Sequence, residues 1–324
     1  MTESEPTSIP PQPQPGKLIF VGPQGLRAGW RVLIFIALVV AFAAISHFVL
    51  GPFLRNRLPH GFTVTTVVVG ELVQFGIVLV ASLIMGRFER RTLADYGLPF
   101  RLMFRRQFWT GALWGFAMLS FIVALMAATR AYSTGGIALS LSSILEYGLG
   151  WALAFLLVGF FEEFALRGYL QFTLTMGLGF WPAAAITSIL FASGHISNPG
   201  ENWIGVVEIV LIAIFLCTAL RRTGNLWFAI GWHMAFDWGE SFFYSTPNSG
   251  IHATGHLFNA SLMGSKWLSG GTVGPEASVF DLIVTLTGIL LLAKIYPQAK
   301  YPALPPPAAV LATGPGAAIE AAPS

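Results

Sequence analysis

Long runs of apolar residues constrain this chain more than any other feature of its sequence. Eight runs are each close to the ~20 residues that an α-helix needs to cross the hydrocarbon core of a membrane. They are residues 32–52, 62–86, 108–129, 144–166, 178–197, 203–220, 224–244 and 278–296. Lipid offers backbone amides no hydrogen-bond partner, and the period-2 alternation of a membrane β-barrel is absent. The sequence therefore predicts an all-α polytopic membrane protein with about eight transmembrane helices.

The charge content agrees with a membrane environment and excludes other classes. Only 10% of the 324 residues are charged, whereas about 25% is usual for a soluble protein. A net charge of +3, with no basic run interleaved with aromatic residues, excludes a nucleic-acid-binding surface. The single cysteine, Cys217, excludes a disulfide scaffold and a cysteine metal cluster.

The distribution of basic residues predicts the orientation in the membrane. With the N-terminus in the cytoplasm, 14 of the 18 lysines and arginines fall in cytoplasmic segments. Arg55, Arg57, Arg130 and Lys266 remain on the other side. The positive-inside rule therefore favours cytoplasmic positions for both termini, in agreement with an even number of spans. The compact loops and Ala/Pro-rich tails indicate a bacterial plasma membrane.

The two ends of the chain differ in composition from the apolar segment between them. Residues 1–26 are Pro-rich and polar at their start, and residues 299–324 are rich in Pro and Ala. Both are predicted to be disordered cytoplasmic tails that flank a transmembrane domain at residues 27–298. The N-terminus lacks the pattern of a cleaved signal peptide, so we expect the first span to be a retained anchor.

Ionisable residues inside the predicted spans are the main functional signal. Eight of the 15 acidic residues lie at membrane depth, together with three histidines, and they concentrate in the fourth to seventh spans. Each costs several kcal/mol unless it is paired or hydrated, so it is a functional hypothesis by default. The residues are Glu71, Glu146, Glu162, Glu163, Glu208, Asp237, Glu240, Asp281, His47, His195 and His233.

The densest group of these residues is at the end of the fourth span. Glu163 and Arg167 are spaced i, i+4 on one helical face and can form an ion pair. Glu162 points about 100° away and is left free as a base that could activate water. The alternative is a structural network in which both acids and Arg167 close a helix end.

Two further polar groups follow at similar spacing in the fifth and seventh spans. Phe191 and His195 end the fifth span, where a histidine can also serve only as a cap or hydrogen-bond partner. His233 and Asp237 form an i, i+4 pair in the seventh span. This pair suits an imidazole oriented by a carboxylate, a metal site or an oxyanion donor, or an ordinary interhelical hydrogen bond.

In combination, these motifs resemble the signature of the CAAX protease and bacteriocin-processing (Abi) family of intramembrane endopeptidases, which includes the type II CAAX prenyl proteases. The resemblance rests on Glu162-Glu163-x-x-x-Arg167, Phe191-x-x-x-His195 and His233-x-x-x-Asp237, and it extends over about residues 86–244. Flanking segments at residues 91–98, 167–170 and 221–226 are also similar to the family.

The resemblance implies an eight-helix core with a cavity that opens toward the cytoplasmic side. By position, Glu162 would activate water, His195 would help to hold that water, and His233 and Asp237 would stabilise the oxyanion. Glu163 and Arg167 would shape the site. The family more often has Asn where this chain has Asp237, so Asp237 would instead orient His233. The substrate would be a peptide or protein, membrane-anchored or prenylated in some members.

Several alternatives stay open from the sequence. Glu162, His195 and His233 could supply the His₂Glu ligand set of a catalytic zinc, and a metal-free glutamate mechanism fits the same residues. A Ser193–His233 dyad lacks the glycine pattern of rhomboid proteases. A proton- or ion-coupled transporter would use acids such as Glu71 and Asp281 as relays, and a non-catalytic immunity or scaffold member of the family would only bind. The roles of Glu208 and Glu240 are not predicted.

Overall fold

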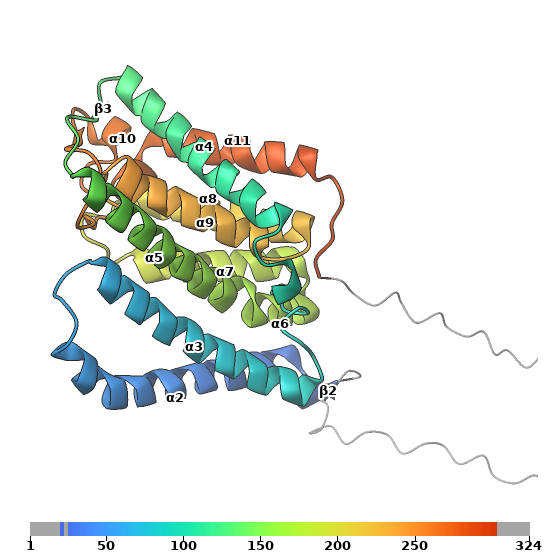
Figure 1. Cartoon of the computed structure of the whole chain (residues 1–324). Coiled ribbons are helices and arrows are strands. Elements are labelled where there is room, and N and C mark those ends of the chain that lie inside the picture. Colours follow the sequence, from blue (N-terminus) through green and yellow to red (C-terminus); the bar gives the residue numbers. More distant parts are fainter. Residues whose placement is uncertain (1–19, 23–24, 303–324) are drawn as a thin grey trace, which may run out of the picture.

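The apolar runs form a bundle of helices in the computed structural model, which describes residues 20–22 and 25–302 (Figure 1). Most of the two predicted tails lies outside the described residues. The long helices are α2 (Ala28–Arg55), α3 (Val64–Glu89), α4 (Arg106–Ala128), α5 (Leu141–Arg167), α6 (Tyr169–Leu178), α7 (Phe180–His195), α8 (Trp203–Thr223), α9 (Trp227–Trp238) and α11 (Val279–Ile295). The fold class predicted from the sequence, an all-α polytopic membrane protein, is confirmed.

Shorter elements lie between these helices. They are the strands β1 (Val21–Gly22), β2 (Gly25–Leu26), β3 (Tyr132–Ser133) and β4 (Ser261–Leu262), the 3₁₀ turns η1 (Phe100–Leu102) and η3 (Pro275–Ala277), the π-helical turn η2 (Gly239–Phe243) and the short helix α10 (Lys266–Ser269). Strands β1 and β2 pair in antiparallel fashion, and so do β3 and β4. The second pair joins the loop after α4 to the long loop before α11.

Each of the eight predicted spans corresponds to a helix, but the helices differ in length. Five helical segments among the described residues are long and apolar enough to cross a membrane: α2, α3, α4, α8 and the continuous α5–α6 segment Leu141–Leu178. Helices α7, α9 and α11 are shorter, with 16, 12 and 17 residues. Hydropathy did not predict α6, which begins directly after Gly168, the residue that caps the end of α5.

Local sequence signals explain where several helices begin and end. Thr63 and Thr66 form a reciprocal capping box at the start of α3. The side chain of Asn202 accepts hydrogen bonds from the backbone of Ile204 (2.9 Å) and Gly205 (3.3 Å) at the start of α8. Helix α8 ends at Gly224, whose φ of +92° is the left-handed conformation that glycine adopts without strain.

The helices pack in two rows that together frame the interior. Contacts link α3, α5, α9 and α4 in one row, and α2, α6, α7, α8 and α11 in the other. The rows join through α2 and α3 at one edge and through α4 and α11 at the other. Helices α5 and α7 lie opposite each other, one in each row, and contact each other over only a short stretch. A space lined by side chains can therefore form between them.

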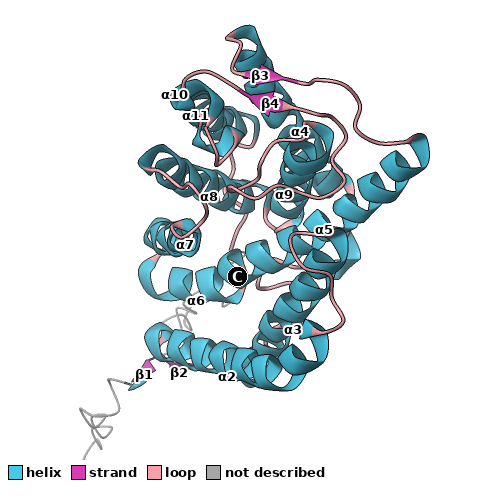
Figure 2. Ribbon diagram, turned by 90° about the vertical axis from the view of Figure 1, so that its left-hand side faces the viewer, coloured by secondary structure: helices cyan, strands magenta, loops and turns pink. Residues whose placement is uncertain are grey.

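The bundle has two distinct ends, visible in Figures 1 and 2. The end that we call the terminus end holds both ends of the described chain and the connections at residues 90–105 and 221–226. The end that we call the loop end holds the connections at residues 56–63, 129–140, 196–202 and 244–278. Most of the basic residues lie at the terminus end, as the predicted topology requires.

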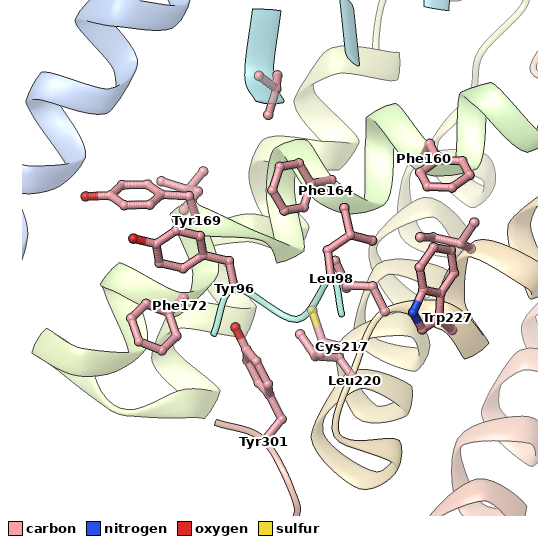
Figure 3. Packing of buried hydrophobic residues seen from close by; sticks show 14 of the residues in the cluster. Tyr96, Leu98, Phe160, Phe164, Tyr169, Phe172, Cys217, Leu220, Trp227 and Tyr301 are labelled. Carbon is pink, nitrogen blue, oxygen red and sulfur yellow. The ribbon is translucent and has the colours of Figure 1, made fainter. Parts of the chain in front are cut away.

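An aromatic-rich cluster fills the terminus end of the bundle (Figure 3). Phe160 and Phe164 of α5, Trp227 of α9 and Tyr169 of α6 pack there with residues of α8 and the 92–98 segment. The cluster includes Tyr301, which is buried although the predicted C-terminal tail begins at residue 299. At its edge, Glu89 pairs with Arg31 and accepts a hydrogen bond from the Tyr169 hydroxyl. This end of the molecule is closed by packed side chains.

Glycines allow α4 and α9 to approach each other closely. A Cβ at Gly111 would collide with the backbone carbonyl of Phe228, and one at Gly231 would collide with that of Phe108. Small residues at such crossings let backbones pack tightly where no hydrophobic driving force acts between membrane helices.

We therefore expect Gly111→Ala to lower the free energy of unfolding by about 1–3 kcal/mol, because α4 and α9 must move apart. Thermal unfolding in detergent would measure this change. Gly70→Ala is the matched control, since Gly70 on α3 has open space around its Cβ position. Equal melting temperatures for the two variants would contradict close packing between α4 and α9.

Candidate active site

The two adjacent glutamates of α5 have different surroundings. Glu163 is fully buried, and its Oε1 lies 3.2 Å from Nη1 of Arg167, which is also fully buried. The side chain of Glu162 is 24% exposed and lines a cavity. The i, i+4 pair expected from the sequence therefore forms, and Glu162 is the carboxylate that remains available.

His233 of α9 lies at the centre of the carboxylates. Its Nδ1 is 3.0 Å from Oε1 of Glu163, and its Nε2 is 3.4 Å from Oε2 of Glu162 and 3.5 Å from Oδ2 of Asp237. An ionised carboxylate can only accept hydrogen bonds, so both ring nitrogens face acceptors. The imidazole is oriented by Glu163 and by Asp237, one turn further along its own helix.

His195 ends α7 on another side of the same cavity. Its Nδ1 lies 2.8 Å from the backbone carbonyl oxygen of Phe191, one turn earlier in the helix. A carbonyl oxygen accepts hydrogen bonds, so Nδ1 carries the hydrogen and Nε2 is left for another partner. The ring of Phe191 contacts His195, with centroids 4.6 Å apart, and the Arg167 guanidinium lies 4.6 Å from the Phe191 centroid. The Phe191 ring also meets His233 edge to face, with centroids 6.5 Å apart, and thus connects the three motifs.

The cavity between the rows has a volume of about 550 Å³. Glu162, His195, His233 and Asp237 line it together with residues from α3, α8 and the loop end. Residues of the terminus-end connections do not contribute to the lining. In Figure 2, which views the bundle from the loop end, α6 crosses the far side of the space between α5 and α7. The cavity therefore extends toward the loop end, while the aromatic-rich cluster closes the other.

Glu162, His195 and His233 are the residues that would have to hold a metal ion. A zinc ligand set needs lone pairs of both histidines and of a carboxylate directed at one point. Within residues 20–22 and 25–302, no group of three or more His, Cys, Asp and Glu side chains could hold a metal ion. In this structure Nε2 of His233 lies 3.4 Å from Oε2 of Glu162, and Nδ1 of His195 lies 2.8 Å from the backbone carbonyl oxygen of Phe191.

Two cavity residues were not assigned to the site by the sequence motifs. Glu71 of α3 and Glu276 of η3 both line the cavity. The sequence identifies Glu71 only as an acid at membrane depth. Glu276 lies in a loop whose sequence contains no motif that points to a functional role. Their closeness to the site depends on helix packing and on how the long loop folds back.

Glu208, Glu240 and Asp281 form a separate buried group that does not line the cavity. All three are fully buried, and both carboxylate oxygens of Glu240 lack a hydrogen-bond partner. The Thr285 hydroxyl lies 3.1 Å from Oδ1 of Asp281, and both carboxylate oxygens of Glu208 also lack a hydrogen-bond partner. Glu240 lies in the π-helical turn η2, which continues α9.

The profile of the type II CAAX prenyl endopeptidase Rce1-like family matches residues 144–239. Residues 144–239 belong to this family. No curated protein matches the chain.

The region that matches the Rce1-like family runs from the start of α5 to the first residue of η2. It contains the three motifs on which the resemblance was based, so the family assignment made from the sequence is confirmed. The family consists of proteases, and the chain is therefore a membrane protein with a protease domain. Glu71 and Glu276 lie outside the matched region.

Proposed function

We propose that this protein is an intramembrane endopeptidase in which Glu162 activates a water molecule for attack on a peptide bond. One observation carries the proposal: of two adjacent carboxylates, Glu163 is held by Arg167 and His233, while Glu162 faces the cavity. A carboxylate with a free oxygen in a partly apolar cavity is suited to act as a general base.

In the proposed reaction, Glu162 accepts a proton from water, and the water oxygen attacks the carbonyl carbon of the scissile bond. Nε2 of His195 accepts a hydrogen bond from the same water and helps to hold it. The negative oxygen of the tetrahedral intermediate receives a hydrogen bond from Nε2–H of His233. Glu162 then passes its proton to the leaving nitrogen as the C–N bond breaks, which yields a carboxylic acid and an amine.

The surroundings of the cavity favour a membrane-anchored peptide as substrate. Leu190 of α7 lines the cavity, and Leu72 of α3 follows the cavity residue Glu71 in the chain; they are 45% and 52% exposed, which suits contact with lipid. A segment held in the bilayer could therefore approach Glu162 between the two helices. This proposal includes prenylated peptides and unmodified membrane-bound peptides alike.

Two considerations bear on the face from which the substrate enters. The family resemblance implies a cytoplasmic opening, but the cavity lining includes loop-end residues such as Ile251 and Asn198. Since the positive-inside rule favours a cytoplasmic terminus end, we infer that peptides enter from the opposite face.

Cysteine labelling can test this inference, because the sole native cysteine, Cys217, is buried. A membrane-impermeant maleimide added to intact cells should label Ile251→Cys at the cavity. It should leave Gln298→Cys, at the exposed terminus end, unlabelled until the membrane is permeabilised. The reverse labelling pattern would show that the cavity opens toward the cytoplasm instead.

Substrate profiling in native membranes tests the proposed function as a whole. Peptides released by cells with the wild-type protein should be absent from cells with Glu162→Gln at equal protein level. Identical peptide profiles would contradict proteolysis. Ion flux in liposomes that is unaffected by Glu162→Gln would favour the transporter alternative.

A further inference from the structure

The cavity is lined by more acidic than basic side chains. Four carboxylates line it, from Glu71, Glu162, Asp237 and Glu276. Among the described lining residues there are two histidines but neither a lysine nor an arginine. Glu162 is the proposed base and Asp237 orients His233, whereas Glu71 and Glu276 have no role in the proposed reaction. Both extra acids lie outside the family-matched region.

Glu71 approaches the site from α3. Its Oε1 accepts a hydrogen bond of 3.0 Å from Nε2 of Gln74, one turn further along the helix. Its Oε2 is buried and has no hydrogen-bond partner. The carboxylate is close enough to interact electrostatically with Glu162 and His233. One oxygen of Glu71 is thus left without a partner beside the proposed base.

Glu276 approaches from the loop end. Its Oε2 accepts hydrogen bonds from the backbone amide (2.6 Å) and the hydroxyl (2.9 Å) of Ser249. These bonds fix the carboxylate in the cavity wall, within electrostatic range of His195. Burial raises the pKa of Glu276, because a carboxylate loses hydration there without gaining a cation.

A carboxylate that is removed from water without a counter-ion is costly, and the cost falls when an opposite charge arrives. The fully buried Arg167 is paired with Glu163. A positive charge on whatever enters the cavity would lower this cost and favour the ionised form of both acids. A peptide can supply it as the ammonium of lysine, the guanidinium of arginine or a free α-amino group.

We propose that Glu71 and Glu276 are specificity-determining residues that bind a basic side chain of the substrate near the scissile bond. This proposal rests on the proposed endopeptidase function. Peptides with lysine or arginine beside the cleaved bond are preferred, and peptides with an acidic residue there are rejected, because the carboxylates attract the first and repel the second.

Matched fluorogenic peptides would test the preference in the purified full-length protein. The peptides are N-acetylated and C-amidated and differ only in Lys, Met or Glu at each position beside the scissile bond. At its best position the Lys peptide should exceed the Met peptide about tenfold in kcat/KM, equivalent to about 1.4 kcal/mol. Glu71→Gln and Glu276→Gln should each bring this ratio toward one. Glu146→Gln, an exposed acid on α5 outside the cavity, should keep it.

Binding to an inactive protein separates this proposal from the proposed function. In the Glu162→Gln background, fluorescence anisotropy should show tighter binding of the acetylated Lys peptide than of the Met peptide. Adding Glu71→Gln should remove the difference. Equal binding of the two peptides would overturn the proposal whether or not the wild type cleaves either. A preference that requires an unblocked N-terminus would overturn the side-chain assignment in favour of an α-amino group.

Discussion

Glu162→Gln should lower kcat/KM for peptide cleavage by a factor of about 10² to 10⁴, the range expected when a general base is removed. Glutamine keeps the size and polarity of the side chain but cannot accept a proton from water. Because the side chain of Glu162 is 24% exposed to the cavity, the replacement leaves the packing of α5 unchanged. The measurement is cleavage of a quenched peptide by purified protein, with unfolding followed in parallel.

Two other glutamates of α5 serve as comparisons for this prediction. Glu146→Gln, on the same helix, should retain activity because Glu146 is exposed and distant from the cavity. Glu163→Gln should lower stability as well as activity, since Glu163 bonds Arg167 and His233 in the interior. Turnover by Glu162→Gln within about tenfold of the wild type would remove Glu162 from the role of base.

Arg167→Leu should lower the free energy of unfolding by about 3–5 kcal/mol, because it leaves the carboxylate of Glu163 buried without its cation. Arg167 and Glu163 are both fully buried, with Nη1 and Oε1 3.2 Å apart. The substitution also removes the guanidinium from the ring of Phe191, which contacts His195. Unfolding by denaturant in detergent would measure the loss.

A double variant tests whether the unpaired carboxylate causes this loss. Arg167→Leu combined with Glu163→Gln should recover part of the stability, since removal of both charges avoids an isolated buried ion. Arg101→Leu replaces an exposed arginine and should change stability by no more than about 0.5 kcal/mol. If the double variant were less stable than Arg167→Leu alone, the buried pair would not be the reason.

Several features of the site could be predicted from the sequence because they depend on spacing within one helix. The pair Glu163–Arg167 and the contact between His233 and Asp237 are both i, i+4 relations, which α-helical geometry sets in advance. The same logic left Glu162 as the free carboxylate. Motif order then led to the correct family before any tertiary contact was considered.

Other features could not be predicted because they join segments far apart in the chain. Glu71 and Glu276 are separated by more than 200 residues and meet only because α3 and the loop before α11 border one cavity. Hydropathy reads one segment at a time, so it missed the short α6, whereas α7 and the continuous α9–η2 segment lie within the predicted spans 178–197 and 224–244. Hydropathy also does not indicate which end of the bundle is closed by packed aromatic side chains.

The sequence by itself therefore determined the environment, the helical class and the three polar motifs, because each follows from composition or from helical periodicity. Only the tertiary structure decided how those motifs meet. Packing brought His233 between Glu162 and Glu163, extended the cavity to the loop end, and brought two further acids into its wall. The physical reason is that contacts between helices depend on the shapes of many side chains together, which no local pattern records.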